Sequence, residues 1–293
     1  MQKQIDKKAF LLLIVLSFIW GYNWVVMKKG ISYMPDLYFA FFRAFFGSLL
    51  LFGILAFNKK SLKIKHVKYT SILGILQTTG FVGFTLLALR FGEAGKTAIL
   101  VYSMPFWLMV LSWKILKEKS DKIEILSNIL AFLGLFFVLK PWNMNLSGGA
   151  LGDVLAILSA LSWAFSVIWQ KLHMDLNKDI IAINAWQMII GSSGLLVLAF
   201  LLEHFYIKFS YYLLFAILYN AVLGNALAWI IWSYAIKRLP PGIMGLTMLL
   251  APIIGMVSSM LELGEKMGIY EAFGSFLIVL GLLITTIDRI RKY

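Results

Sequence analysis

Long apolar runs follow one another along almost the whole chain, separated by short polar stretches. Each run is apolar at nearly every position. A membrane-spanning β-strand would instead alternate apolar and polar residues over about ten positions. A helix needs about 20 apolar residues to cross a bilayer. The pattern therefore predicts an all-α integral membrane protein with ten transmembrane helices. The predicted spans cover residues 10–28, 37–57, 69–89, 95–115, 123–139, 150–170, 181–202, 212–234, 241–261 and 270–287.

The overall composition leaves little room for anything besides these spans. Hydrophobic residues make up 61% of the chain, charged residues only 14%, and the mean hydropathy is +0.85. An average soluble domain carries about 25% charged residues. The longest connection between predicted spans, from Asn58 to Lys68, has 11 residues. We therefore expect the membrane bundle to carry the function.

The basic residues are spread unevenly between the two sets of connections. With the N-terminus in the cytoplasm, 19 of the 27 Lys and Arg residues fall on inside segments and 7 on outside segments, and Arg43 alone lies within a span. This asymmetry follows the positive-inside rule and predicts a multi-pass plasma-membrane protein with both termini in the cytoplasm. The net charge of +13 forms no clustered patch with base-stacking elements, so we expect no nucleic-acid partner.

The chain also repeats itself. Residues 105–119 and 252–266 share Pro, Met, Val, Ser, Leu, Glu and Lys at equal positions, at an offset of 147 residues. Five spans per half is an odd number, so the second copy would enter the membrane from the opposite face. The repeat therefore predicts two inverted five-helix units, residues 1–146 and 147–293, with a site between them.

Several short motifs, in this order across two halves, resemble the EamA-type transporters of the drug/metabolite transporter superfamily. They are Trp20 with Gly21, Arg43, Pro105 with Glu118, and Pro252 with Glu265. The resemblance covers nearly the whole chain and implies a ten-helix bundle, a central substrate cavity, alternating access and export of small metabolites. The second half departs from the first, with Ala164 in place of Gly21 and Gln187 in place of Arg43.

The two repeated prolines predict paired helix bends. A proline in a span removes a backbone hydrogen bond, and paired interruptions point to the transport site. Near Pro105, the side chains of Tyr102, Ser103 and Trp107 would then face the substrate. The alternative is that Pro105 and Pro252 only shape the bundle.

Arg43 is the strongest single candidate for cargo binding. A charge in the middle of a span costs about 2.5–3.5 kcal/mol on insertion scales, so something must compensate it. Its guanidinium could hold a carboxylate or phosphate through two parallel hydrogen bonds. It could instead reach outward to the interface or bond carbonyl groups of a neighbouring helix.

Neutral polar and aromatic residues within the spans complete the candidate set. Gln77 and Thr78 correspond by the repeat to Gly224 and Asn225, so the third and eighth spans both have a polar middle. Such side chains either line a cavity or join helices. The predicted substrate-binding residues are Asn23, Arg43, Gln77, Thr78, Tyr102, Ser103, Trp107, Trp163, Gln187, Asn225 and Trp229, with Pro105 and Pro252 as helix bends.

Other chemistry finds little support. The chain has no cysteine, and its histidines and mid-span positions offer no catalytic or metal-ligating cluster, so we expect no enzyme activity, metal or cofactor. Glu118 and Glu265 would lie at opposite faces of the membrane, where a structural role suits each. Gly134 and Gly281 would let helices approach closely, in a homodimer or within a monomer.

These observations predict a secondary transporter that exports small organic metabolites, such as amino acids or related amphiphiles, by alternating access. The partners would be the cargo and the lipid bilayer. A membrane scaffold or sensor is the first alternative, and an intramembrane enzyme is the second.

Overall fold

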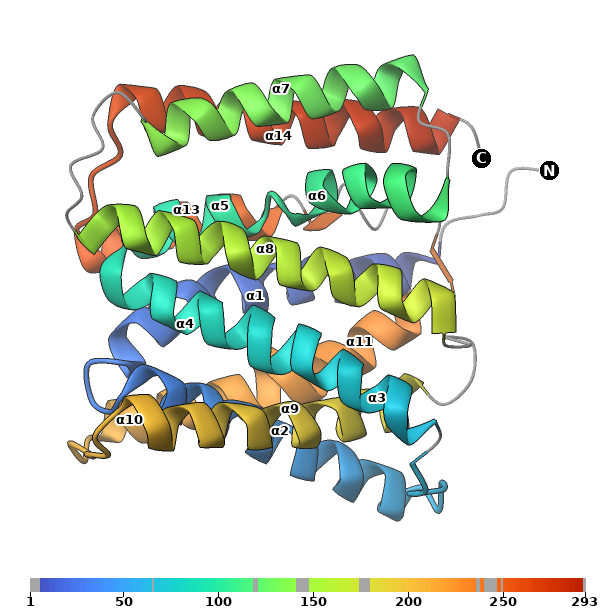
Figure 1. Ribbon diagram of the computed structural model, residues 1–293, viewed down its shortest axis with the longest axis vertical. Coiled ribbons are helices and arrows are strands. Elements are labelled where there is room, and N and C mark those ends of the chain that lie inside the picture. Colours follow the sequence, from blue (N-terminus) through green and yellow to red (C-terminus); the bar gives the residue numbers. More distant parts are fainter. Residues whose placement is uncertain are drawn as a thin grey trace.

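A computed structural model describes residues 6–64, 66–117, 121–140, 148–173, 180–235, 238–239, 247–248 and 250–291. Every regular element in these residues is a helix, and the helices lie roughly side by side in layers (Figure 1). The helices are α1 (Lys7–Gly30), α2 (Asp36–Phe57), α3 (Val67–Gly74), η1 (Ile75–Gly80), α4 (Phe81–Phe91), α5 (Ala94–Val101), α6 (Met104–Leu111), η2 (Ser112–Leu116), α7 (Lys122–Leu139), α8 (Gly148–His173), α9 (Ile180–Leu202), α10 (Tyr211–Leu218), η4 (Tyr219–Leu227), α11 (Ala228–Ala235), α13 (Leu250–Leu263) and α14 (Ile269–Arg291).

Seven of the described helical stretches are long and apolar enough to cross a membrane, and three further apolar helices are shorter. The seven are Lys7–Gly30, Asp36–Phe57, Val67–Phe91, Ala94–Leu116, Gly149–His173, Ile180–Leu202 and Tyr211–Ala235. The shorter ones are Ile125–Leu139, Leu250–Leu263 and Ile269–Ile284. The structure is thus a multi-pass helical bundle.

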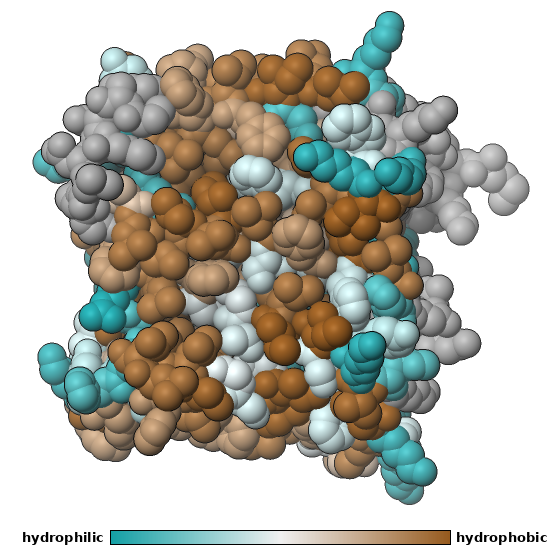
Figure 2. All heavy atoms as spheres, in the orientation of Figure 1, coloured by the Kyte–Doolittle hydropathy of each residue, from teal (hydrophilic) through white to brown (hydrophobic). Residues whose placement is uncertain are grey.

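The outer surface of the bundle is apolar where lipid would touch it. Figure 2 shows hydrophobic side chains over the middle of one face and most hydrophilic ones near its two margins, where the helices end. Large apolar side chains such as Phe200 and Leu261 are 79% and 82% exposed. A soluble protein rarely exposes so much contiguous apolar surface, whereas a bilayer requires it.

The layer at one side of the bundle consists of α7 and α14, packed along most of their length (Figure 1). A Cβ atom built on Gly134 would lie 2.5 Å from the carbonyl oxygen of Gly274, and one on Gly281 would lie 2.7 Å from the carbonyl oxygen of Ser127. The two glycines expected to allow close approach therefore serve packing within this chain.

Three long helical stretches are irregular in the middle. The stretch Val67–Phe91 contains the π-helical segment η1, and the stretch Tyr211–Ala235 contains the π-helical segment η4. The stretch Ala94–Leu116 is interrupted by a turn at Tyr102 and Ser103, and Pro105 is the second residue of α6, which follows this turn. Because π-helical turns and breaks concentrate at functional sites, these three places direct attention to the bundle interior.

Helix α1 packs closely against α13. A Cβ atom on Gly21 would lie 2.7 Å from the Cβ of Ile254, and one on Gly255 would lie 3.0 Å from the Trp24 ring. The glycine of the Trp20 and Gly21 motif is therefore needed for this contact between distant segments. Pro252 is buried in the first turn of α13, and the residue directly before this helix lies outside the described residues.

Candidate functional site

Arg43 lies on α2 and is 8% exposed. Its Nε is fully buried and has no hydrogen-bond partner, and no ion pair of the described residues involves its guanidinium. Its backbone carbonyl accepts a hydrogen bond from Nδ2 of Asn225 at 3.1 Å. A buried cation without a counter-charge is unfavourable, which sets Arg43 apart from the basic residues that form ion pairs.

Two buried amide oxygens lie near the same contact. Oδ1 of Asn23 on α1 and Oδ1 of Asn220 on η4 have no hydrogen-bond partner. Both side chains approach Gly224, since a Cβ built there would lie 3.5 Å from Nδ2 of Asn23 and 3.8 Å from Oδ1 of Asn220. These amide oxygens can accept hydrogen bonds, whereas the guanidinium of Arg43 can only donate them.

Helices α1, α2 and η4 are tied together around these residues. Nε1 of Trp20 donates to the carbonyl of Gly224 at 3.1 Å, and the Tyr219 hydroxyl donates to the carbonyl of Ile19 at 2.8 Å. The Asn225 side chain also donates to the carbonyl of Asn220 at 2.9 Å. The bonds from Trp20 and Asn225 thus satisfy two carbonyl groups of the π-helical segment η4, those of Gly224 and Asn220.

We call this group the polar junction. It comprises Asn23, Arg43, Asn220, Gly224 and Asn225. Asn23 and Arg43 each lie seven residues from the neighbouring helix end, at Gly30 and Asp36, which is about 10 Å by helical rise. The junction therefore lies inside the bundle rather than at its rim.

The polar residues of the third span make a separate group. Thr78 Oγ1 on η1 donates to Oε1 of Gln187 on α9 at 2.7 Å, and Oε1 of Gln77 accepts from Nε2 of Gln170 on α8 at 3.1 Å. These contacts join three helices, as the helix-joining interpretation predicts. Whether Gln77, Thr78 and Gln187 also contact cargo stays a prediction.

The break before Pro105 carries three of the candidate residues. Ser103 Oγ donates to the carbonyl of Leu100 at 2.6 Å and accepts from Nε1 of Trp107 at 3.1 Å. The Tyr102 ring lies 6.2 Å from that of Trp24 on α1. The turn is therefore held by its own side chains and packs against α1.

Two aromatic candidates remain, one on α8 and one on α11. Trp163 on α8 is half-buried and its carbonyl accepts from Ser166. Trp229 on α11 packs against a separate apolar cluster that includes Leu51 and Met188. Sequence reasoning left Asn220 out of the binding set. Its signal was available, because it was one of the few amides within a predicted span.

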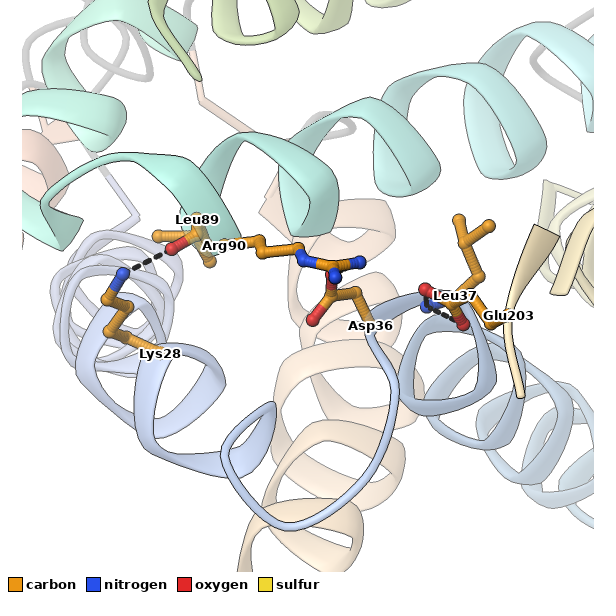
Figure 3. A network of polar contacts seen from close by, with 6 residues as sticks. All are labelled: Lys28, Asp36, Leu37, Leu89, Arg90 and Glu203. Atoms are coloured by element: carbon orange, nitrogen blue, oxygen red, sulfur yellow. Dashed lines mark hydrogen bonds and ion pairs between the residues drawn. The ribbon is translucent and has the colours of Figure 1, made fainter. Parts of the chain in front are cut away.

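The end of the bundle where α1 ends and α2 begins is rich in charges (Figure 3). Lys28 Nζ donates to the carbonyls of Leu89 and Gly92, the second at 2.7 Å, and thereby caps the end of α4. Arg90 on α4 lies 3.5 Å from the carboxylate of Asp36. We call this the Asp36 end of the bundle.

Two carboxyl groups at the Asp36 end have a pKa above the ordinary value of glutamate. Both oxygens of Glu203, which follows α9, accept from the backbone N–H of Leu37 at 3.1 and 3.3 Å (Figure 3). Burial raises the pKa of Glu203 above its ordinary value, although backbone hydrogen bonds oppose the shift. Burial, together with the nearby carboxylates of Glu265 and Glu271, also raises the pKa of Glu93.

An apolar helical bundle with free donors and acceptors buried between its helices is typical of membrane proteins that carry a small solute. The chain belongs to the EamA-like transporter family, whose profile matches residues 7–140 and again residues 150–287. We call these the first and second matched segments.

Named relatives agree with this family. Over 289 residues, 97% of this chain and 99% of the other, it is 30% identical to the uncharacterized transporter YoaV of Bacillus subtilis (strain 168). It is 27% identical to a probable amino-acid metabolite efflux pump of Salmonella typhimurium, covering 98% of this chain and 97% of that protein. A solved crystal structure with 14% identity superposes with a TM-score of 0.69 over 97% of this chain and 98% of that one, which shows a shared fold.

Proposed function

We propose that this protein is a secondary transporter that exports small organic metabolites, such as amino acids or related amphiphiles, across the plasma membrane by alternating access. Ten spans in two inverted five-helix repeats, residues 1–146 and 147–293, would surround the cargo, with both termini in the cytoplasm. Family membership supports transport, and two relatives named as probable amino-acid metabolite efflux pumps support this class of cargo.

The observation that carries the proposal is the unsatisfied chemistry of the polar junction. Nε of Arg43 is a free buried donor, and Oδ1 of Asn23 and of Asn220 are free buried acceptors. Leaving such groups unpaired is unfavourable by roughly 1–3 kcal/mol each, and more for a charge. An amino acid carries a carboxylate for the guanidinium and an ammonium for the amide oxygens.

A purely structural scaffold would have no use for unpaired buried groups between helices. The family and the names of the relatives indicate a transporter rather than an enzyme. The interruption at Tyr102 and Ser103 and the π-helical segments η1 and η4 lie in the middle of three long helical stretches, and discontinuous helices support a transport site near the midplane.

The test is transport by the purified protein in liposomes. Counterflow of labelled amino acids is measured for the wild type, Arg43→Leu and Arg43→Lys, with Arg238→Leu as the matched control because that arginine lies exposed at a helix end. A charge-assisted hydrogen bond contributes about 1.5–3 kcal/mol, so Arg43→Leu should lower counterflow about tenfold or more. Counterflow of Arg43→Leu equal to that of the control would reject the cargo role of Arg43.

Direction and cargo are tested together in cells. Growth medium from cells that overproduce the wild type is compared with medium from cells that produce equal amounts of Arg43→Leu. Compounds that accumulate only with the wild type identify the exported metabolites. A medium that is the same in both cases would contradict export.

A further inference from the structure

Glu265 joins the two matched segments through a pair of short hydrogen bonds. This residue follows α13, and its Oε1 and Oε2 accept from the backbone N–H groups of Ala94 and Gly95 at 2.6 and 2.9 Å. These are the first two N–H groups of α5, which have no partner within their own helix. Glu93 occupies the N-cap position of α5, but its side chain makes no capping bond. Glu265 thus supplies from the second segment the cap that α5 lacks.

Three ion pairs surround this contact, and they all have the same polarity. Lys29 pairs with Glu262 at 2.6 Å, Lys96 with Asp153 at 2.7 Å, and Lys140 with Glu271 at 2.8 Å. In each pair the cation belongs to the first matched segment and the carboxylate to the second. We call the Glu265 contact and these three pairs the charged seam.

The helices beneath the charged seam are in direct contact. A Cβ atom built on Gly95 would lie 2.5 Å from Oγ of Ser259 and 3.4 Å from Cα of Met256, so α5 and α13 touch at this point. A small recess, lined among others by Lys96, Ser259 and Glu271, opens above it. The structure is therefore closed between these two helices at the Asp36 end.

We propose that Glu265 is the gate residue of this closure: it holds α13 against α5 and must release the Ala94 and Gly95 amides each time the Asp36 end opens. This rests on the proposed function, under which the Asp36 end faces outward and cargo leaves through it. A carboxylate that accepts hydrogen bonds from two amides at a helix N-terminus is stabilised both by these charge-assisted bonds and by the helix dipole. The Lys29 and Glu262 side chains are 32% and 33% exposed, and such pairs contribute little, so Glu262 is a matched control.

The test uses the absence of cysteine in this chain. Ser259→Cys places a single thiol of nearly the same size beneath the charged seam, and its reaction with a membrane-impermeant thiol reagent reports opening. In this background, Glu265→Gln should raise the labelling rate about tenfold, because glutamine lacks the charge and has only one oxygen to accept the two N–H groups. Glu262→Gln should change the rate by less than about twofold.

A second substitution alters the same contact from the first matched segment. Gly95→Ala should also raise labelling of the Ser259→Cys thiol, because its Cβ would push α5 away from α13 at this position. All variants are first checked for folding by size-exclusion chromatography and thermal unfolding. If Glu265→Gln does not fold, Glu265→Asp decides the question, because its shorter side chain keeps the charge but draws the carboxylate back from the two amides. Labelling at the rate of the Glu262→Gln control in the folded variants would overturn the gate.

Failure of the gate and failure of the transport function give different results. Labelling needs no cargo, so faster labelling in Glu265→Gln supports the gate even where no tested amino acid is carried. Conversely, normal counterflow with unchanged labelling rejects the gate and leaves transport intact.

Discussion

Nδ2 of Asn225 donates to the backbone carbonyl of Arg43 at 3.1 Å, which joins the π-helical segment η4 to the turn of α2 that carries the buried guanidinium. The same amide donates to the carbonyl of Asn220 at 2.9 Å. Asn225 therefore positions both kinds of free group in the polar junction, the donor on α2 and the acceptor on η4. It can affect binding in this way without touching the cargo.

Replacing this amide should weaken cargo binding. Asn225→Leu removes both hydrogen bonds, so we expect the KM for amino-acid counterflow to rise about three- to tenfold with a smaller change in kcat, since a hydrogen bond contributes about 1 kcal/mol. Asn58→Ala, which removes an exposed amide bonded within its own helix, is the control. An equal KM in both variants would speak against the positioning role.

The bond between Thr78 and Gln187 should matter mainly for stability. Thr78→Val keeps the shape of the side chain but leaves Oε1 of Gln187 without its donor. In membrane helices such a bond contributes about 0.6–1.7 kcal/mol, so the thermal midpoint in detergent should fall. We expect the KM of the folded variant to stay within about twofold of wild type, as a bond of this size allows. A larger rise would instead place Thr78 in the cargo site.

Close packing of α7 on α14 can be tested with two glycines. Gly134→Ala puts a Cβ 2.5 Å from the Gly274 carbonyl oxygen and should destabilise the fold by about 1–3 kcal/mol. Gly53→Ala is the matched control, because nothing lies within 4 Å of its built Cβ. Alanine there should leave stability unchanged or raise it by up to about 1 kcal/mol. Equal thermal midpoints for the two variants would contradict the packing argument.

The pair of Lys96 and Asp153 offers a charge exchange within the charged seam. The two side chains are 21% and 8% exposed, so Lys96→Asp should destabilise the folded protein by roughly 2 kcal/mol, between the values for exposed and buried pairs. Adding Asp153→Lys restores opposite charges and should recover at least half of the lost thermal midpoint. A double variant no more stable than Lys96→Asp would mean that the pair acts through local packing alone.

The raised pKa of Glu203 gives a pH dependence with a definite sign. The folded protein binds a proton at this group more readily than the unfolded chain does, so its contribution to stability grows as the pH falls through the raised pKa toward the ordinary glutamate value of about 4.3. The difference in thermal midpoint between wild type and Glu203→Gln should therefore shift in favour of wild type over this range. A difference that stays constant with pH would show that the group titrates normally.

The sequence alone was enough to predict a helical membrane protein and its family. The apolar runs identified the helices, because a span needs about 20 apolar residues to cross a bilayer, whichever residues it packs against. The polar middle of the third and eighth spans was also visible, and both places contain π-helical segments, η1 and η4. Arg43 stood out because a charge within a span is rare.

Only the tertiary structure shows which distant residues contact one another. Glu265 was expected to have a structural role, but only the fold shows that it caps α5, 171 residues earlier in the chain. Likewise, Thr78 and Gln187 are polar in sequence, and only their 2.7 Å contact shows that they join η1 to α9. Hydropathy and helical period are local properties, whereas a hydrogen bond depends on which distant backbones approach within about 3 Å. Close approach is set by glycine contacts such as Gly21 on Ile254, which no local pattern encodes.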